Sequence, residues 1–501
     1  MKKLFSLSFL GLILFFGSCS DDKNENILVN DDTTLSDIST NLMNFDYEGG
    51  SANFSVKCAA VPEISSDESW IIVNRLNSSN KVHTYSVTVS ANPQSDIRMG
   101  YVTVTSGKSS EIITINQEAA PNWSVDEPTE DETQSILGIN AVEISKQIKN
   151  GWNIGNTLEV PGGETGWGNP KVNEAYVAGI KAAGFNAVRI PCAWDSHIID
   201  SKTNTIDPEW LDRVNEVVGY VLSNDMFAIL NIHWDGGWLE NNIGNASTPE
   251  LVNKQKALWT QIATRLAHYN EKLLFAGLNE PNAGNEWGSS SDNVMAMQAL
   301  LDYEQAFVDG VRSTGGNNAT RTLVVQAPHT SINMAYDYMD TLPEDPAGEG
   351  YMMVEVHYYD PSDYTIMETD GSWSPYVKFF WGKDYHQGGN RDCSWGEESS
   401  MLSQLQKMEN KFVNKGIPVV LGEYGAYPEE HISKVNVTFS DDEIATIKAS
   451  REYWYQCFSK YTNQTGILPF VWDTGELINR NTGEVKDGKQ YIIDAILSGH
   501  N

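Results

Sequence analysis

Two hydrophobic patterns divide the chain. From about Asp37 to Glu118, short β-branched runs alternate apolar with polar residues and are separated by Gly, Asn, Pro and Ser. Such alternation is typical of strands with one buried face, and no helical period interrupts it. The pattern predicts an all-β, immunoglobulin-like sandwich of about 80 residues.

From Ile136 onward, apolar strand-like runs alternate with amphipathic helical stretches. Eight runs are predicted strands: 151–156, 187–191, 227–233, 274–279, 322–326, 352–357, 418–422 and 468–472. Six stretches are predicted helices: 173–183, 208–223, 249–269, 294–312, 402–414 and 442–460. This order favours a closed (β/α)8 TIM barrel. An open doubly wound sheet is the alternative, but no glycine-rich phosphate loop follows the first strand.

The N-terminus is typical of an exported lipoprotein. Residues 1–18 carry two lysines and then an apolar run too short to span a bilayer comfortably. Residues 16–19 read FGSC and resemble a bacterial lipobox, which implies cleavage before Cys19 and a lipid on its sulfur. Residues 20–22 read SDD and resemble an acidic tag for the outer face of the outer membrane. A plain secretory signal with an incidental cysteine is the alternative.

Proline and a run of acidic residues keep residues 119–135 extended, and polar residues before the sandwich form a tether. The predicted organisation is a signal peptide at 1–18, a tether at 19–36, the sandwich at 37–118, an acidic linker at 119–135 and the barrel at 136–501. Cys58, Cys192, Cys393 and Cys457 have no disulfide-framework spacing, so we expect buried free thiols.

Composition narrows the range of partners. A formal charge of −33 disfavours nucleic acid and anionic polysaccharides, whereas a neutral polymer is compatible with it. The chain holds 15 Trp and 21 Tyr, more than a core of this size usually needs. Aromatic faces suit sugars, which are apolar on their faces and wet at their edges.

Polar residues end the predicted barrel strands, at the carboxyl ends where such barrels hold their active sites. They are Asn156, Arg189, His233, Asn279, Glu280, His357, Tyr359, Glu423 and Trp472. Either glutamate alone could cap a helix or pair with an arginine. Glu280 and Glu423, at the mouths of strands four and seven, can face each other across the barrel, as glycosidic cleavage requires.

Arg189 has a structural salt bridge as its alternative role. We expect it instead beside Glu423, where its charge would lower the pKa of that carboxyl and keep it ionised as a nucleophile. Glu280 would need a raised pKa in order to protonate the leaving oxygen.

Six motifs resemble those of glycoside hydrolase family 5 and occur along the chain in the same order as in that family. They are GWNIGNTL at 151–158, VRIP at 188–191, NIH at 231–233, GLNEP at 277–281, HYY at 357–359 and LGEYG at 421–425. They fit subfamily 4, and the whole chain resembles gut-bacterial surface endo-xyloglucanases. The resemblance implies a retaining endo-β-1,4-glucanase with Glu280 as acid/base and Glu423 as nucleophile, whose carboxyl groups would lie about 5–5.5 Å apart.

The resemblance also implies substrate-binding roles for Arg189, His233, Asn279, His357, Tyr359 and Trp472. In that family pattern Asn279 binds the sugar 2-hydroxyl and Tyr359 orients the nucleophile. Trp472 forms a stacking floor and precedes a non-proline cis peptide bond. One departure is Trp234, where many relatives have a second histidine. Its indole either widens the stacking surface or packs underneath.

Residues 69–73, which read SWIIV, together with residues 112–117, resemble the BACON module found beside bacterial carbohydrate-active enzymes. We expect Trp70 to pack in the core of that module, which would then act as a spacer. A long aromatic insertion between Tyr359 and Trp395 either walls the cleft or packs upon itself.

No catalytic metal or other cofactor is expected. His233, Asp235 and His357 are metal-ligand types, but no H-x-x-x-H or H-E-x-x-H spacing is present. The expected partners are a neutral plant β-glucan, xyloglucan, and a membrane reached through the lipid on Cys19, with the protein a monomer at the cell outer membrane. A general endoglucanase or mannanase, or a non-catalytic glycan-binding lipoprotein, is the alternative function.

Overall fold

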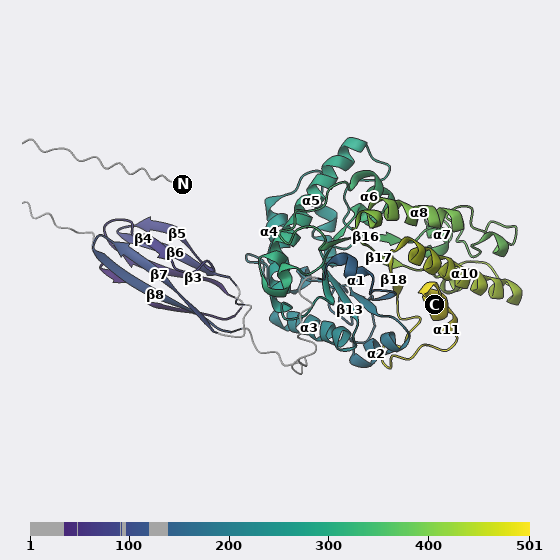
Figure 1. Ribbon diagram of the computed structural model, residues 1–501, viewed down its shortest axis with the longest axis horizontal. Helices are drawn as coiled ribbons and strands as arrows, with labels where there is room; N and C mark the ends of the chain where they lie inside the picture. Colours follow the sequence, from purple (N-terminus) through teal and green to yellow (C-terminus); the bar gives the residue numbers. More distant parts are fainter. Residues whose placement is uncertain (1–34, 48, 91, 93–96, 120–138, 501) are drawn as a thin grey trace, which may run out of the picture. The chain divides into compact units, whose positions relative to one another are not determined.

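The computed structural model describes residues 35–47, 49–90, 92, 97–119 and 139–500. The chain forms two compact units, one that ends at Gln117 and one that continues from Glu118 (Figure 1). The predicted signal peptide and Cys19 lie outside the described residues, as do almost all of the predicted tether and linker.

The first unit is a sandwich of two four-stranded sheets, in the orders β1-β3-β6-β5 and β2-β8-β7-β4. The strands are β1 Asp37–Ile38, β2 Leu42–Phe45, β3 Gly50–Lys57, β4 Glu63–Ser66, β5 Ile71–Ser79, β6 Val82–Val89, β7 Arg98–Ser106 and β8 Ser109–Gln117. Alternate residues of both sheets meet in one apolar core, including Val56, Val87, Val104 and Ile115. Trp70 packs against this core, with the Arg98 guanidinium 4.3 Å from its ring centroid, as expected for a packing residue.

The second unit is a closed barrel in which each strand pairs in parallel with its neighbours and β18 pairs with β9. Its strands are β9 Gly151–Ile154, β10 Ala187–Ile190, β13 Phe227–Asn231, β14 Leu273–Ala276, β15 Leu323–Gln326, β16 Met352–Tyr358, β17 Val419–Tyr424 and β18 Leu468–Asp473. The hairpin β11 Ile198–Asp200 and β12 Thr205–Ile206 lies outside the barrel sheet. The predicted fold classes of both units are confirmed.

Helices surround the barrel, and their caps explain where the boundaries differ from the prediction. The helices are α1 Ala141–Ser145, α2 Glu174–Ala182, α3 Pro208–Ser223, α4 Pro249–Arg265, α5 Ser290–Arg312, α6 Ile332–Tyr338, α7 Ser362–Thr365, α8 Glu398–Lys411, α9 Pro428–His431, α10 Asp441–Thr465 and α11 Gln490–Leu497. Helix α5 begins four residues early because the Ser289 side chain caps it. Helix α10 runs to Thr465, where Gly466 in the left-handed region ends it.

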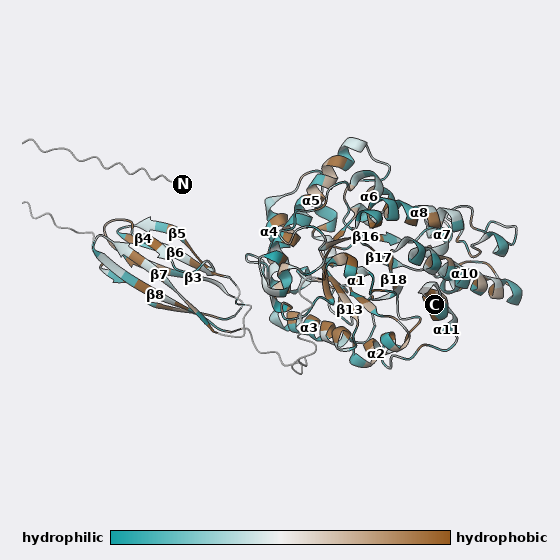
Figure 2. Cartoon of the chain, in the orientation of Figure 1, coloured by the Kyte–Doolittle hydropathy of each residue, from teal (hydrophilic) through white to brown (hydrophobic). Residues whose placement is uncertain are grey.

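Inward-pointing and outward-pointing residues alternate along each strand. The inward-pointing side chains fill the barrel interior in two layers. The lower layer is apolar, includes Phe227, Leu274 and Phe470, and is closed by residues of α1 and the turn after it. Figure 2 shows hydrophobic residues concentrated on the barrel strands, for example on β13. The upper layer is polar and completely buried, and we call it the polar layer: Asn153, Arg189, Asn231, Gln326 and Glu355.

Part of the aromatic insertion after β16 is packed in a core that it shares with a neighbouring segment, and part of it is exposed. Val377, Phe379 and Phe380 are buried in a small core with Phe439 and Ile447 from the segment before and within α10. Trp373, Tyr376 and Trp395 stay exposed at 59%, 41% and 45% of their surfaces. The insertion is thus an ordered loop that carries exposed aromatic side chains.

Cys58, Cys192, Cys393 and Cys457 are buried free thiols, as expected. Within the described ranges, none of the helices has the length and apolar character that crossing a membrane demands.

Candidate active site

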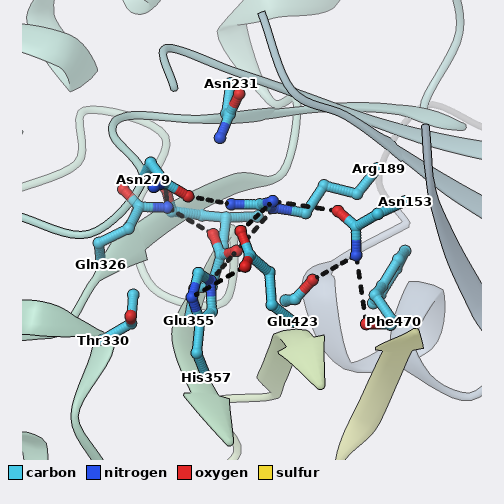
Figure 3. A network of polar contacts seen from close by, with 12 residues as sticks. Asn153, Arg189, Asn231, Asn279, Gln326, Thr330, Glu355, His357, Glu423 and Phe470 are labelled. Carbon is cyan, nitrogen blue, oxygen red and sulfur yellow. Dashed lines mark hydrogen bonds and ion pairs between the residues drawn. The ribbon is translucent and has the colours of Figure 1, made fainter. Parts of the chain in front are cut away.

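Arg189 on β10 organises the polar layer at the carboxyl end of the barrel. Its Nη1 donates to Oδ1 of Asn153 and to Oε1 of Glu423, each over 3.0 Å. Its Nη2 donates to Oδ1 of Asn279 over 2.7 Å, and its Nε lies 2.9 Å from Oε1 of Glu355. Figure 3 shows the guanidinium at the centre of these contacts, which come from separate elements of the barrel.

A β-bulge turns the Glu423 side chain into the barrel. The pairing of β16 with β17 shifts between Val356 and His357, so that His357 lies opposite Glu423 and Gly422 is left over. A bulge of this kind re-aims a side chain that regular alternation would point outward. In this position Oε2 of Glu423 accepts a hydrogen bond of 3.1 Å from the hydroxyl of Tyr359.

Glu280 approaches from a loop. The sequence had predicted that Asn279 and Glu280 end a strand. Strand β14 instead ends at Ala276, so both residues lie in the loop that follows it. The loop is held because the Glu280 backbone N–H donates to Oε1 of the buried Glu240 over 2.8 Å. The Glu280 side chain is 46% exposed, and its Oε1 lies 2.8 Å from Nδ1 of His357.

His357 brings the two glutamates together. Its Nδ1 lies 2.8 Å from Glu280 and 3.8 Å from Oε2 of Glu423. An oxygen of each carboxylate and a ring nitrogen of His357 all lie within 4.8 Å of one another. The two acids therefore meet across the mouth of one barrel, one exposed and one buried.

The family model for cellulases, glycosyl hydrolase family 5, matches residues 151–477, well over half of the chain. The chain belongs to glycosyl hydrolase family 5. The BACON family model matches residues 59–118, which lie mostly within the sandwich.

Relatives of known function and solved structures agree with this placement. A xyloglucan-specific endo-β-1,4-glucanase of Bacteroides ovatus is 32% identical over 474 residues, which cover 92% of this chain and 90% of the relative. A solved Bacteroides ovatus family 5 xyloglucanase, in complex with a XXXG heptasaccharide, is 29% identical with a TM-score of 0.64, covering 92% of this chain and 98% of that one. A broad-specificity endoglucanase of Bacteroides salanitronis is 34% identical with a TM-score of 0.63, covering 73% and 96% of the two chains. This family 5 member is thus a glycoside hydrolase of an endo-β-1,4-glucanase family.

The remaining predicted residues line the same mouth. The rings of His233 and Trp472 stack with centroids 5.8 Å apart, and Gly155 leaves room for the indole because a Cβ there would meet it at 2.6 Å. Burial, with the charge of Arg189, lowers the pKa of His233 well below its usual value, so its ring is neutral. Trp234 is 44% exposed, which favours the reading in which it widens the aromatic surface over the one in which it packs underneath.

The expected cis peptide bond after Trp472 is wrong. Among the described residues the cis bond is Asp360–Pro361. Strand β18 continues in register through Asp473, which pairs with Ile154, so the regular trans backbone of a strand extends past the indole.

Sequence reasoning missed two buried acids and two amides that hold the site. Glu355 and Gln326 lie in the polar layer, Asn153 accepts from Arg189, and Glu240 holds the Glu280 loop. Glu355 had a signal in the sequence, because it lies two residues before His357 and so shares its face of the strand. Asn156, which was expected at the site, instead turns its backbone with φ +59° and donates its N–H to Glu159.

The charges around the two acids correct the expected directions of their pKa shifts. Partial burial alone would raise the pKa of Glu280, but the hydrogen bond and charge of His357 and the charge of Arg189 outweigh it and lower the pKa. Burial raises the pKa of Glu423, although His357 and Arg189 act to lower it. Both directions are opposite to those predicted, because the sequence did not place His357 between the two acids.

His357 itself carries the proton of this cluster. Burial would lower its pKa, but Glu423, Glu280 and Glu355 together raise it to about 9. Glu280, Glu423 and His357 also offer atoms at a spacing that could hold a metal ion. The imidazolium and the Arg189 guanidinium 3.0 Å from Glu423 both oppose a cation there.

We predict that kcat/KM on a soluble β-glucoside is lost as pH rises through about 9, where the His357–Glu280 pair gives up its proton. The protonated pair is the competent form, and a raised pKa keeps it populated below that value. His357→Asn should move this loss of kcat/KM, the alkaline limb of the pH profile, to lower pH. His268→Asn, at a position remote from the site, should leave the alkaline limb in place. An alkaline limb unaffected by His357→Asn would contradict the prediction.

Proposed function

We propose that the protein is a retaining endo-β-1,4-glucanase that cleaves the xyloglucan backbone, with Glu280 as acid/base and Glu423 as nucleophile. The observation that supports it is the approach of the two carboxylates, since an oxygen of one lies within 4.8 Å of an oxygen of the other. Retaining pairs lie about 5–5.5 Å apart, whereas inverting pairs are about 6.5–9.5 Å apart in order to admit a water.

In the first step the Glu423 carboxylate attacks the anomeric carbon while the glycosidic C–O bond breaks and the leaving oxygen takes a proton from Glu280. Bound glucan covers the exposed half of Glu280 and favours its neutral form, so the proton moves from His357 to Glu280 before transfer. In the second step water attacks the glycosyl ester, Glu280 takes the water proton, and the bond to Glu423 breaks. Arg189 and Tyr359 hold Glu423 by hydrogen bonds of 3.0 and 3.1 Å.

Glu280→Ala and Glu423→Ala should each lower turnover of xyloglucan about a thousandfold or more with the fold intact. With an activated aryl β-cellobioside, azide should restore turnover of both variants with opposite stereochemistry. The Glu280 variant should yield the β-glycosyl azide, since azide takes the place of water at the glycosyl-enzyme. The Glu423 variant should yield the α-glycosyl azide, since azide replaces the nucleophile. Exchange of these two products would reverse the assignment.

Xyloglucan as substrate is supported by the xyloglucan specificity of the Bacteroides ovatus relatives and by exposed indoles on the loops of the barrel, among them Trp234, Trp287 and Trp373. A general endoglucanase is the second candidate, because broad-specificity endoglucanases are also among the similar structures.

Hydrolysis of xyloglucan, carboxymethyl cellulose, mixed-linkage glucan and mannan by the full chain separates these candidates. We expect the highest kcat/KM on xyloglucan, with reducing ends released early and at internal bonds. Equal rates on all β-1,4-glucans would favour the general endoglucanase, and release of no reducing ends would leave only a glycan-binding role.

We also propose that Cys19 carries a lipid that anchors the enzyme at the outer membrane, facing the cell exterior, with the sandwich as a spacer. The support is the FGSC motif at residues 16–19 and the acidic residues that follow it. Radiolabelled palmitate should be incorporated into the wild-type protein in a bacterial host but not into the Cys19→Ala variant. The variant should also be lost from the membrane fraction. Equal labelling of the two would contradict the anchor.

A further inference from the structure

Glu355 is a third carboxylate directly beneath the catalytic pair, and its side chain is completely buried. Its Oε1 lies 2.9 Å from Nε of Arg189 and 3.3 Å from Nε2 of His357. Its Oε2 accepts a hydrogen bond of 2.6 Å from Nε2 of Gln326. A buried carboxylate is tolerated only with such partners, and two of these three hold a glutamate of the active site.

The chain also leaves space for this carboxylate. A Cβ at Gly422 would lie 1.8 Å from Oε1 of Glu355, much closer than any contact allows. The φ angle of Gly422 is not in the left-handed region, so Glu355 and not backbone torsion explains the glycine. The residue before the nucleophile is therefore small because Glu355 occupies its side-chain position.

The geometry of His357 requires both ring nitrogens to donate. Nδ1 faces Oε1 of Glu280 at 2.8 Å, and Nε2 faces Oε1 of Glu355 at 3.3 Å. Carboxylate oxygens accept hydrogen bonds, so an imidazole between two of them is satisfied only as an imidazolium. Glu355 thus fixes one N–H and leaves the other directed at Glu280.

The three nitrogens of the Arg189 guanidinium likewise have separate partners. Its Nε faces Glu355, which leaves Nη1 for Glu423 and Nη2 for Asn279. A guanidinium is planar, so an anchor at Nε sets the direction of both other nitrogens.

We propose that Glu355 is a positioning residue of the proposed hydrolysis, a buried anion that orients Arg189 toward Glu423 and keeps His357 an imidazolium that supplies the acid/base proton to Glu280. It does not reach the substrate. It acts through the two cations.

The charged groups that face Glu355 come from several elements. Arg189 is on β10, His357 is on the same strand β16, Glu423 is on β17, and Glu304 on α5 interacts with it electrostatically. Gln326 on β15 is neutral, and its Oε1 accepts the backbone N–H of Leu278 over 2.7 Å. Removal of the Glu355 charge leaves two cations facing fewer carboxylates, and His357 then loses its proton more easily.

The test is Glu355→Gln in the full chain, which keeps the shape of the side chain and removes its charge. We expect kcat on an aryl β-cellobioside to fall about tenfold to hundredfold while KM changes less than about twofold. The alkaline limb of kcat/KM should move down by about one pH unit or more, as His357 gives up its proton earlier. Titration of active sites with a 2-deoxy-2-fluoro glycoside counts the folded enzyme, so a loss of folded protein is not taken for a loss of kcat.

Asp345→Asn is the matched control, because it removes a buried carboxylate that pairs with Arg312 at 2.7 Å, where both side chains are 5% exposed. It should cost stability and leave the pH profile unchanged. Glu355→Asp keeps the charge and should hold the alkaline limb close to the wild-type position with a smaller loss of kcat. This variant decides the question if the Gln variant does not fold.

Gly422→Ala is an independent variant, since it keeps the Glu355 charge but displaces it from Arg189 and His357. It should shift the alkaline limb in the same direction as Glu355→Gln. A wild-type pH profile and kcat in Glu355→Gln, or the same shift in Asp345→Asn, would overturn the inference. Absence of hydrolysis by the wild-type chain would instead overturn the proposed function.

Discussion

The contact between the buried Arg189 guanidinium and Glu423 is the interaction on which the site depends. A buried charge costs several kcal/mol unless it is paired and hydrogen-bonded. Arg189 meets this condition with two carboxylates, Glu355 and Glu423, and with the side-chain oxygens of Asn153 and Asn279. Because these partners come from β9, β16, β17 and the loop after β14, one side chain fixes four segments of the barrel mouth relative to one another.

The two layers of the barrel interior determine the surroundings of this contact. The apolar lower layer fills the interior, so the polar layer above it is shielded from below and opens toward the mouth. Regular alternation places Arg189 and Glu355 inward. The bulge at Gly422 then brings Glu423 to the same side, opposite His357. Three carboxylates and two cations thus share one small volume, and the ionisation of each depends on all of the others.

Much of this arrangement could be predicted from the sequence. The hydrophobic periods gave the sandwich and the eight-stranded barrel, and the polar strand ends gave Arg189, His357, Glu423 and the Asn279–Glu280 pair. The limits of helices and strands were predicted less accurately than their existence. Caps such as Ser289, and the hydrogen bond by which Glu240 holds the Glu280 loop, cannot be recognised from hydrophobic periodicity. The protonation pattern was predicted in the wrong direction, since the sequence shows which residues reach the mouth but not that His357 lies between the two acids.

The central claim is that Glu280 and Glu423 act from the same small site by double displacement. Proton NMR of the first oligosaccharides released from xyloglucan tests it most directly, because it identifies the anomer formed before mutarotation. The short separation of the carboxylates predicts that the β-anomer appears first and the α-anomer follows. Initial release of the α-anomer would mean inversion, and Glu423 could not then be the nucleophile.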